Sequence, residues 1–226
     1  MEKNPVPVIM MSSLTKEGAE ITIEALSLGA CDFVTKDFAN FGTLASRESE
    51  IIAKVKNVAR SRLRLMLRKL DVARKPVAVN PDRKGSHEIL AIGASTGGPP
   101  ALQLILTRLP KAFPVPVVIA QHMPKVFTQS FSQRLDAVSQ LNVKEAEEGE
   151  TLKAGVVYIA PGDRHMSLKR KGTTVSVQFD DTVQYIYRPS VDLLMGSTAL
   201  AYDRQAFGVI LTGMGNDGVV GMKEVK

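Results

Sequence analysis

One stretch of the sequence, GASTG at residues 93–97, places a single hydroxyl among small residues directly after the apolar run that begins at Ile89. It satisfies the G-x-S-x-G pattern, in which small neighbours let the chain turn sharply and leave a nucleophilic serine exposed. A structural or phosphate-binding turn before a helix is the competing interpretation. The glycines of this stretch are followed by no Lys-Ser/Thr pair and form no G-x-G-x-x-G pattern, so the common nucleotide-binding motifs are disfavoured at this position. Ser95 is therefore a candidate nucleophile.

A serine hydroxyl becomes reactive when a base accepts its proton and a third group orients that base. The sequence has three histidines. His87 precedes the strand of Ser95 and is expected at the opposite edge of the sheet. His165 follows the end of another strand and remains a candidate. His122 comes directly after the apolar run VVIAQ, so it is the preferred base, because functional residues of open α/β sheets gather beyond the carboxyl ends of strands.

Asp217 is the preferred orienting acid, since it lies in the glycine-rich loop TGMGNDG that follows the apolar run FGVIL. Asp163 and Asp192 remain alternatives, and a turn or capping role for Asp217 stays open. The same loop could supply a backbone N–H to a developing oxyanion. The chain order Ser, His, Asp differs from the Ser, Asp or Glu, His order of α/β-hydrolases, so the motif does not assign the chain to that fold.

Strand-like and helix-like patterns alternate around these residues. The expected strands are 89–93, 115–120, 156–160 and 207–211, and the expected helices are 99–107, 128–138 and 190–201, the last with Ser190 as N-cap. Residues 166–177 alternate about a Lys171-Gly172 turn, which predicts a β-hairpin. The alternation predicts an α/β fold with a doubly wound, mainly parallel sheet over residues 88–226.

Residues 1–70 form a separate strand, helix, strand, helix pattern, and residues 71–87 contain two prolines and a glycine without any period, as in a linker. The net charge of +6 is concentrated here, with nine Lys or Arg against two Asp between residues 60 and 84. A solvated helix face that continues into a linker explains this better than a nucleic-acid patch.

Composition excludes several classes of protein. The longest apolar runs are far shorter than the roughly 20 residues that span a bilayer, so no membrane insertion is expected. The first residues lack the pattern of a secretory signal. Cys31 is the only cysteine, which excludes an intrachain disulfide and is consistent with a cytoplasmic location.

The motifs IGASTGGPPAL, QHMP, APGDRHM, RPSVDLLM and LTGMGNDG, in this order, resemble the chemotaxis protein-glutamate methylesterases, response regulators with an esterase output domain. The resemblance implies that Ser95 is the nucleophile, His122 the base and Asp217 its orienting acid. Thr96 and Met214 match residues that shape the family's oxyanion region. No metal or organic cofactor is implied.

The implied reaction is hydrolysis of glutamate methyl esters, and deamidation of glutamines, on the cytoplasmic helical region of methyl-accepting chemotaxis receptors. The intact family also works with the histidine kinase of the chemotaxis pathway, and its unphosphorylated receiver blocks the active site. No nucleic-acid partner is implied. Two other functions stay open: a scaffold that binds receptor tails without hydrolysis, and a DNA-binding response regulator, which only the basic linker favours.

Residues 1–70 resemble the second half of a receiver domain. The match places Ser12 at the switch hydroxyl, Phe33 at the switch aromatic and Lys36 at the phosphate-contacting lysine, although Asp37 replaces the proline that usually follows. The strands that carry the acidic metal-binding pair and the phosphorylated aspartate are missing, so we expect no phosphoacceptor in this chain. The family also continues beyond the position of Lys226, and we expect a chain shortened at both ends to be unstable or poorly active.

Overall fold

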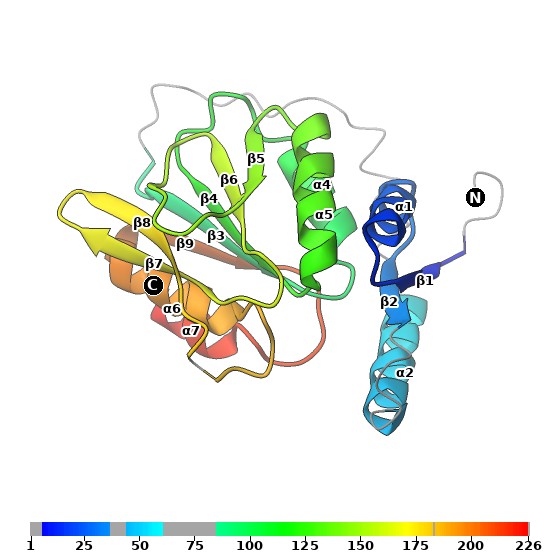
Figure 1. Cartoon of the computed structure of the whole chain (residues 1–226). Coiled ribbons are helices and arrows are strands. Elements are labelled where there is room, and N and C mark those ends of the chain that lie inside the picture. The colour runs from blue at the N-terminus through cyan, green and yellow to red at the C-terminus, as the bar shows by residue number, and fades with distance from the viewer. Residues whose placement is uncertain (1–5, 37–43, 61–84, 183, 226) are drawn as a thin grey trace.

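The computed structural model describes residues 6–36, 44–60, 85–182 and 184–225 (Figure 1). Its largest sheet is fully parallel, with the strand order β5-β6-β4-β3-β9. The strands are β3 (Ile89–Ala94), β4 (Val117–Gln121), β5 (Asn142–Glu145), β6 (Val156–Ile159) and β9 (Ala206–Ile210). The predicted α/β fold with a mainly parallel sheet is confirmed.

Helices cover both faces of this sheet, as Figure 1 shows. One face carries α4 (Gly98–Leu106) and α5 (Lys125–Val138); the other carries α6 (Val191–Tyr202) and α7 (Val219–Glu224), with the short 3₁₀ helix η2 (Asp203–Gln205) after α6. The hairpin β7 (Met166–Lys171) and β8 (Thr174–Phe179) packs against α6.

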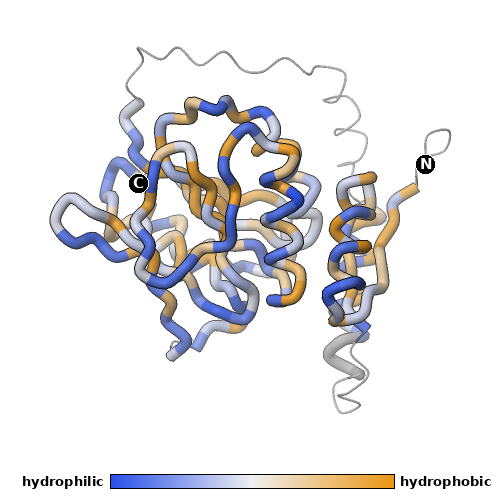
Figure 2. Tube along the Cα trace, turned by 45° about the horizontal axis from the view of Figure 1, so that its top comes forward, coloured by the Kyte–Doolittle hydropathy of each residue, from blue (hydrophilic) through white to orange (hydrophobic). Residues whose placement is uncertain are grey.

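Strand β3 is buried on both faces because its side chains alternate between two cores. Leu90 and Ile92 belong to the cluster under α4 and α5, while Ile89 and Ala91 belong to the cluster under α6. Figure 2 shows hydrophobic residues gathered along the central strands. Packing on both faces holds β3 in place in the sheet, and therefore holds its carboxyl end, which Ser95 directly follows.

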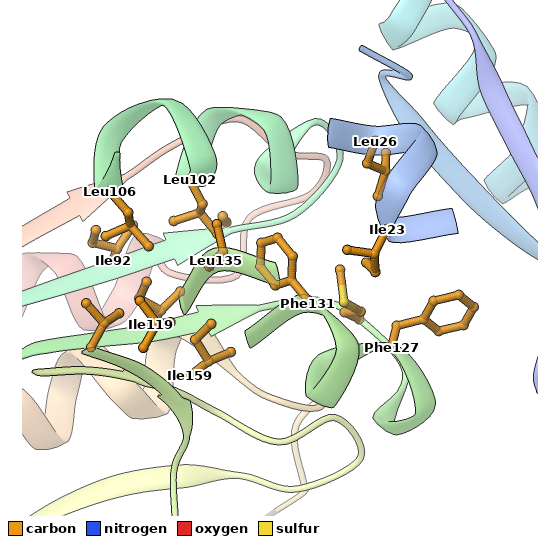
Figure 3. Close-up of a cluster of buried hydrophobic side chains, with 14 of the residues drawn as sticks. Ile23, Leu26, Ile92, Leu102, Leu106, Ile119, Phe127, Phe131, Leu135 and Ile159 are labelled. Atoms are coloured by element: carbon orange, nitrogen blue, oxygen red, sulfur yellow. The ribbon is translucent and has the colours of Figure 1, made fainter. Parts of the chain in front are cut away.

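The N-terminal unit consists of β1 (Ile9–Ser13), α1 (Lys16–Ser27), β2 (Asp32–Lys36) and α2 (Leu44–Arg60), with β1 and β2 paired in parallel. It packs on α5. Ile23 and Leu26 of α1 extend the cluster that contains Phe127 and Phe131 (Figure 3), and Arg134 donates a hydrogen bond to Ser27. One hydrophobic core therefore joins this unit to the central sheet.

Most predicted elements match the structure within a few residues, including the hairpin and the N-cap at Ser190, whose hydroxyl accepts a hydrogen bond from Leu193 N–H. The apolar run at residues 7–11 predicts a first strand that ends before Ser12 and Ser13, and this end is wrong, because both serines lie inside β1. Strand β5 and helix α7 were not predicted. Residues 61–84, with most of the predicted linker and its basic cluster, lie outside the described residues.

Candidate active site

Ser95 occupies the turn between β3 and α4. Gly97 has φ of 74°, a left-handed conformation that glycine adopts without strain, and the helix begins at the next residue. The Gly98 N–H donates to the Ser95 carbonyl at 2.8 Å, and the Ser95 N–H donates to the Thr212 carbonyl at 3.0 Å. These bonds tie the serine turn to the segment that follows β9 and leave the side chain half-buried.

His122 follows β4, the neighbour of β3 in the sheet. Its backbone N–H donates to the Ala94 carbonyl at 3.0 Å, so the strand pairing continues to the loops of Ser95 and His122. Its Nδ1 lies 3.1 Å from Ser95 Oγ. The serine can therefore donate its proton to Nδ1 when the imidazole carries its other proton on Nε2.

Asp217 completes the arrangement from the loop between β9 and α7. Its Oδ2 lies 2.7 Å from His122 Nε2 and accepts a hydrogen bond from Val191 N–H at 2.8 Å. Its Oδ1 accepts from Ser190 Oγ at 3.1 Å and from Asp192 N–H at 3.0 Å. The carboxylate thus lies at the N-terminus of α6, where backbone N–H groups and the helix dipole stabilise negative charge.

This environment lowers the pKa of Asp217. Burial alone would raise it, but the hydrogen bonds from His122 and from the backbone of Asp192 and Val191 outweigh the burial, so the pKa lies below its ordinary value. Asp217 is therefore ionised at neutral pH. An ionised carboxylate at Nε2 holds the tautomer in which Nδ1 is free to accept a proton.

Gln121 fastens the loops of Ser95 and His122 together. Its side chain is 1% exposed, and its Nε2 donates to the carbonyl of Ser95 at 3.0 Å and to that of His122 at 3.1 Å. A side chain that bridges both backbones fixes their separation, and with it the distance between Ser95 Oγ and His122 Nδ1.

The other residues expected near the oxyanion lie in this region too. Thr96 is buried, and Met214 is half-buried in the loop that also carries Asp217. A Cβ on Gly213 would lie 2.8 Å from the Cβ of Ser95, so this loop passes against the serine. Since the Ser95 N–H already donates to Thr212, oxyanion donors must come from other groups.

The side chains of the competing candidates do not join the hydrogen bonds between Ser95, His122 and Asp217. His165 is fully buried, and within the described residues neither of its ring nitrogens has a hydrogen-bond partner; burial, with a smaller contribution from Arg188, lowers its pKa. His87 precedes β3 and packs against Phe207. Asp163 is exposed, and Asp192 accepts the Gly221 N–H rather than a histidine proton.

The three residues expected at receiver switch positions lie in the N-terminal unit. Ser12 is buried and donates to the Gly18 carbonyl at 2.9 Å. Phe33 packs on Phe127 with ring centroids 4.4 Å apart, and Lys36 is exposed.

In the same unit, the Asp32 carboxylate pairs with Lys54 at 3.2 Å. Burial raises the pKa of Asp32, and Lys54 and Thr96 offset part of that effect. The N-terminal unit thus reaches the residue next to Ser95.

Comparison with known proteins gives the family. The CheB methylesterase family model matches residues 90–226. The chain belongs to this family. It is 46% identical, over 98% of its length, to the protein-glutamate methylesterase/protein-glutamine glutaminase of Salmonella typhimurium, and 45% identical, over its whole length, to that of Thermotoga maritima. It spans 63% and 65% of the lengths of these relatives.

The solved CheB methylesterase catalytic domain of Thermotoga maritima is similar in structure, with a TM-score of 0.60 and 48% identity over 62% of this chain and 75% of that one. The family resemblance expected from the motifs is therefore confirmed. No helix in the described part of the chain is long and apolar enough to cross a membrane.

Sequence reasoning missed Gln121, the link from Ser190 to Asp217, and Tyr187, whose ring stacks on His122 at 4.5 Å. Ser190 was recognisable as a helix cap, but its contact with Asp217 depends on tertiary packing. Gln121 lies inside the quoted QHMP motif, beside the candidate base, and this was the one available signal. Nothing in the local pattern around Tyr187 distinguishes it from an ordinary loop residue.

Proposed function

We propose that this chain hydrolyses glutamate methyl esters, and deamidates glutamine side chains, by acyl transfer to Ser95. The observation that carries the proposal is the continuous path of hydrogen bonds from Ser95 Oγ to His122 Nδ1 at 3.1 Å and from His122 Nε2 to Asp217 at 2.7 Å. A hydroxyl, an imidazole and an ionised carboxylate in this order are the parts that nucleophilic acyl transfer requires.

In the first half of the reaction, Ser95 Oγ attacks the carbonyl carbon of the side-chain ester while His122 Nδ1 takes the hydroxyl proton. The tetrahedral intermediate then collapses as His122 returns that proton to the leaving group, so methanol departs, or ammonia in the case of an amide. In the second half, His122 deprotonates water, which attacks the acyl-enzyme and releases glutamate and free Ser95.

Asp217 remains ionised throughout and stabilises the imidazolium that forms in each half. Thr96 and the loop of Met214 are proposed to shape the oxyanion region, because both lie against Ser95. Each of these steps uses side chains of this chain and water.

The proposed substrates are methyl-accepting chemotaxis receptors, processed on their cytoplasmic helical region, with the histidine kinase of that pathway as the upstream partner. Support comes from the family match and from the names of the relatives, which describe action on protein glutamate and glutamine side chains. Residues 1–70 are proposed to be the second half of a receiver domain, and their packing against α5 gives them a contact with the catalytic part.

Substitution of Ser95 by alanine tests the proposal. Release of methanol from a methyl-esterified receptor fragment should vanish, while binding of that fragment persists. Ser86→Ala is the matched control, since Ser86 is an exposed residue that precedes β3 and bonds to His87. Methanol release by Ser95→Ala at the unsubstituted rate would contradict the acyl-enzyme, and fragment binding without any turnover by the unsubstituted chain would favour the scaffold function.

A further inference from the structure

Tyr187 covers the imidazole of the candidate active site. Its ring stacks on that of His122, with centroids 4.5 Å apart and planes inclined by 13°. It comes from the connection between β8 and α6, yet its hydroxyl reaches the loop that carries Asp217, where a Cβ on Gly215 would lie 3.2 Å from Tyr187 Oη. One side chain therefore spans two loops above the histidine.

The two side-chain hydrogen bonds of His122 restrain one motion of its ring only weakly. Hydrogen bonds to Ser95 and Asp217 lie in the plane of the ring and fix its direction within that plane. They resist tilting out of the plane only weakly, because hydrogen-bond energy falls slowly with small angular changes. A second ring stacked on the face blocks this tilt by contact.

We propose that Tyr187 is a positioning residue for acyl transfer, which holds the His122 imidazole in line between Ser95 and Asp217 and stabilises the imidazolium formed when the serine proton moves. This inference rests on the proposed function. The aromatic face attracts a cation, so the stacked tyrosine favours the charged ring of the transition state over the neutral ring of the resting state.

The same segment provides its own control. Tyr185 packs edge-on against the buried ring of His165, with centroids 5.4 Å apart, so the segment is anchored through two histidines. Ile186, between the two tyrosines, is 92% exposed. Its truncation removes a side chain from the same segment without touching either histidine.

The experiment measures the second-order rate at which a fluorophosphonate reagent labels Ser95 in the full chain, with the site confirmed by mass spectrometry. A small reagent reports on the nucleophile without receptor binding. Tyr187→Leu should label about 3- to 30-fold more slowly, the factor that corresponds to a lost cation–π contact. Tyr187→Phe, which keeps the ring, and Ile186→Ala should label within about twofold of the unsubstituted chain, since each keeps the stacked ring.

A spectroscopic readout separates positioning from folding. Ring current from Tyr187 should move the imidazole C–H proton signals of His122 upfield in the unsubstituted chain and in Tyr187→Phe, and the shift should disappear in Tyr187→Leu. Receptor-ester hydrolysis by Tyr187→Leu should show a lower kcat with KM little changed.

An unaltered labelling rate in Tyr187→Leu would overturn the inference and leave the proposed function intact. Equal slowing in Tyr187→Phe and Tyr187→Leu would also overturn it, since the hydroxyl rather than the stacked ring would then be responsible. Absence of the upfield shift in the folded, unsubstituted chain would overturn it even if Tyr187→Leu does not fold. Failure of the unsubstituted chain to label at Ser95 would instead contradict the proposed function.

Discussion

Replacement of Asp217 by asparagine removes the negative charge of the proposed triad and keeps the shape of the side chain. Four donors converge on this carboxylate, and each oxygen accepts from one backbone N–H of α6, those of Val191 and Asp192. Whichever way the asparagine amide turns, its NH₂ faces one of these N–H groups. One backbone donor is then left without an acceptor.

Both expected effects can be worked from this geometry. The unsatisfied donor and the lost charge-assisted hydrogen bonds should reduce the free energy of unfolding by about 2–4 kcal/mol. Loss of a carboxylate beside the imidazolium removes an attraction of about 4 kcal/mol at an effective dielectric of 20, which corresponds to about a 10³-fold lower kcat/KM for methanol release.

The pH dependence of the stability loss follows from the lowered pKa of Asp217. A carboxyl whose folded pKa is depressed contributes stability that is complete above its ordinary value near 3.8 and is lost as the pH falls through the folded pKa. The difference in unfolding free energy between the unsubstituted chain and Asp217→Asn should therefore be constant above about pH 5 and shrink below pH 4.

Methanol release and urea unfolding, measured on the same samples, give both quantities. The matched control is Asp192→Asn, which changes a neighbouring carboxylate that accepts the Gly221 N–H at 2.8 Å but does not contact His122. It should lose stability while its kcat/KM stays within about tenfold of the unsubstituted value, since the charge that faces the imidazolium remains. A folded Asp217→Asn chain with activity within tenfold of the unsubstituted chain would refute the role assigned to Asp217.

Three further substitutions test other contacts. Gln121→Leu removes the donor that bonds to the carbonyls of both Ser95 and His122. It should lower kcat/KM by about 10²-fold and the free energy of unfolding by about 2–4 kcal/mol. Separate measurement of activity and urea unfolding checks this, and near-normal activity would contradict it. Gly213→Ala places a methyl group 2.8 Å from the Ser95 Cβ, so Ser95 labelling should slow more than tenfold without comparable unfolding. The third substitution is Asp32→Asn. Because burial raises the pKa of Asp32, the free energy of unfolding of the unsubstituted chain should fall, relative to that of Asp32→Asn, as the pH rises above about 4. Parallel pH profiles of the unfolding free energy for the two chains would show this reasoning to be wrong.

Much of the site could be predicted from sequence because strand ends determine it. Ser95 and His122 each follow an apolar run, and pairing of β3 with β4 in parallel places them at one edge. Asp217 follows β9, on the other side of β3, for the same reason. The family motifs then selected His122 over His165, a choice that the strand pattern had left open.

Other features depend on packing that no local pattern encodes. Strand β5 has the sequence NVKE, too short and too polar to be distinguished from a loop, and it forms by pairing with β6 at the sheet edge. The contact of Tyr187 with His122 joins two long connections, and Asp217 reaches the start of α6 across 25 residues of sequence. Such contacts depend on the tertiary arrangement, so the sequence shows which residues are present but not that they contact one another.

Trapping the intermediate tests the central claim most directly. The chain is mixed with a methyl-esterified receptor peptide, quenched in acid within the first turnover and digested with trypsin, which should release residues 85–108 as one peptide. An acyl adduct localised by fragmentation to Ser95, and absent from Ser95→Ala, is the predicted result. Methanol release in the first turnover with no adduct, or with an adduct on another residue, would contradict it.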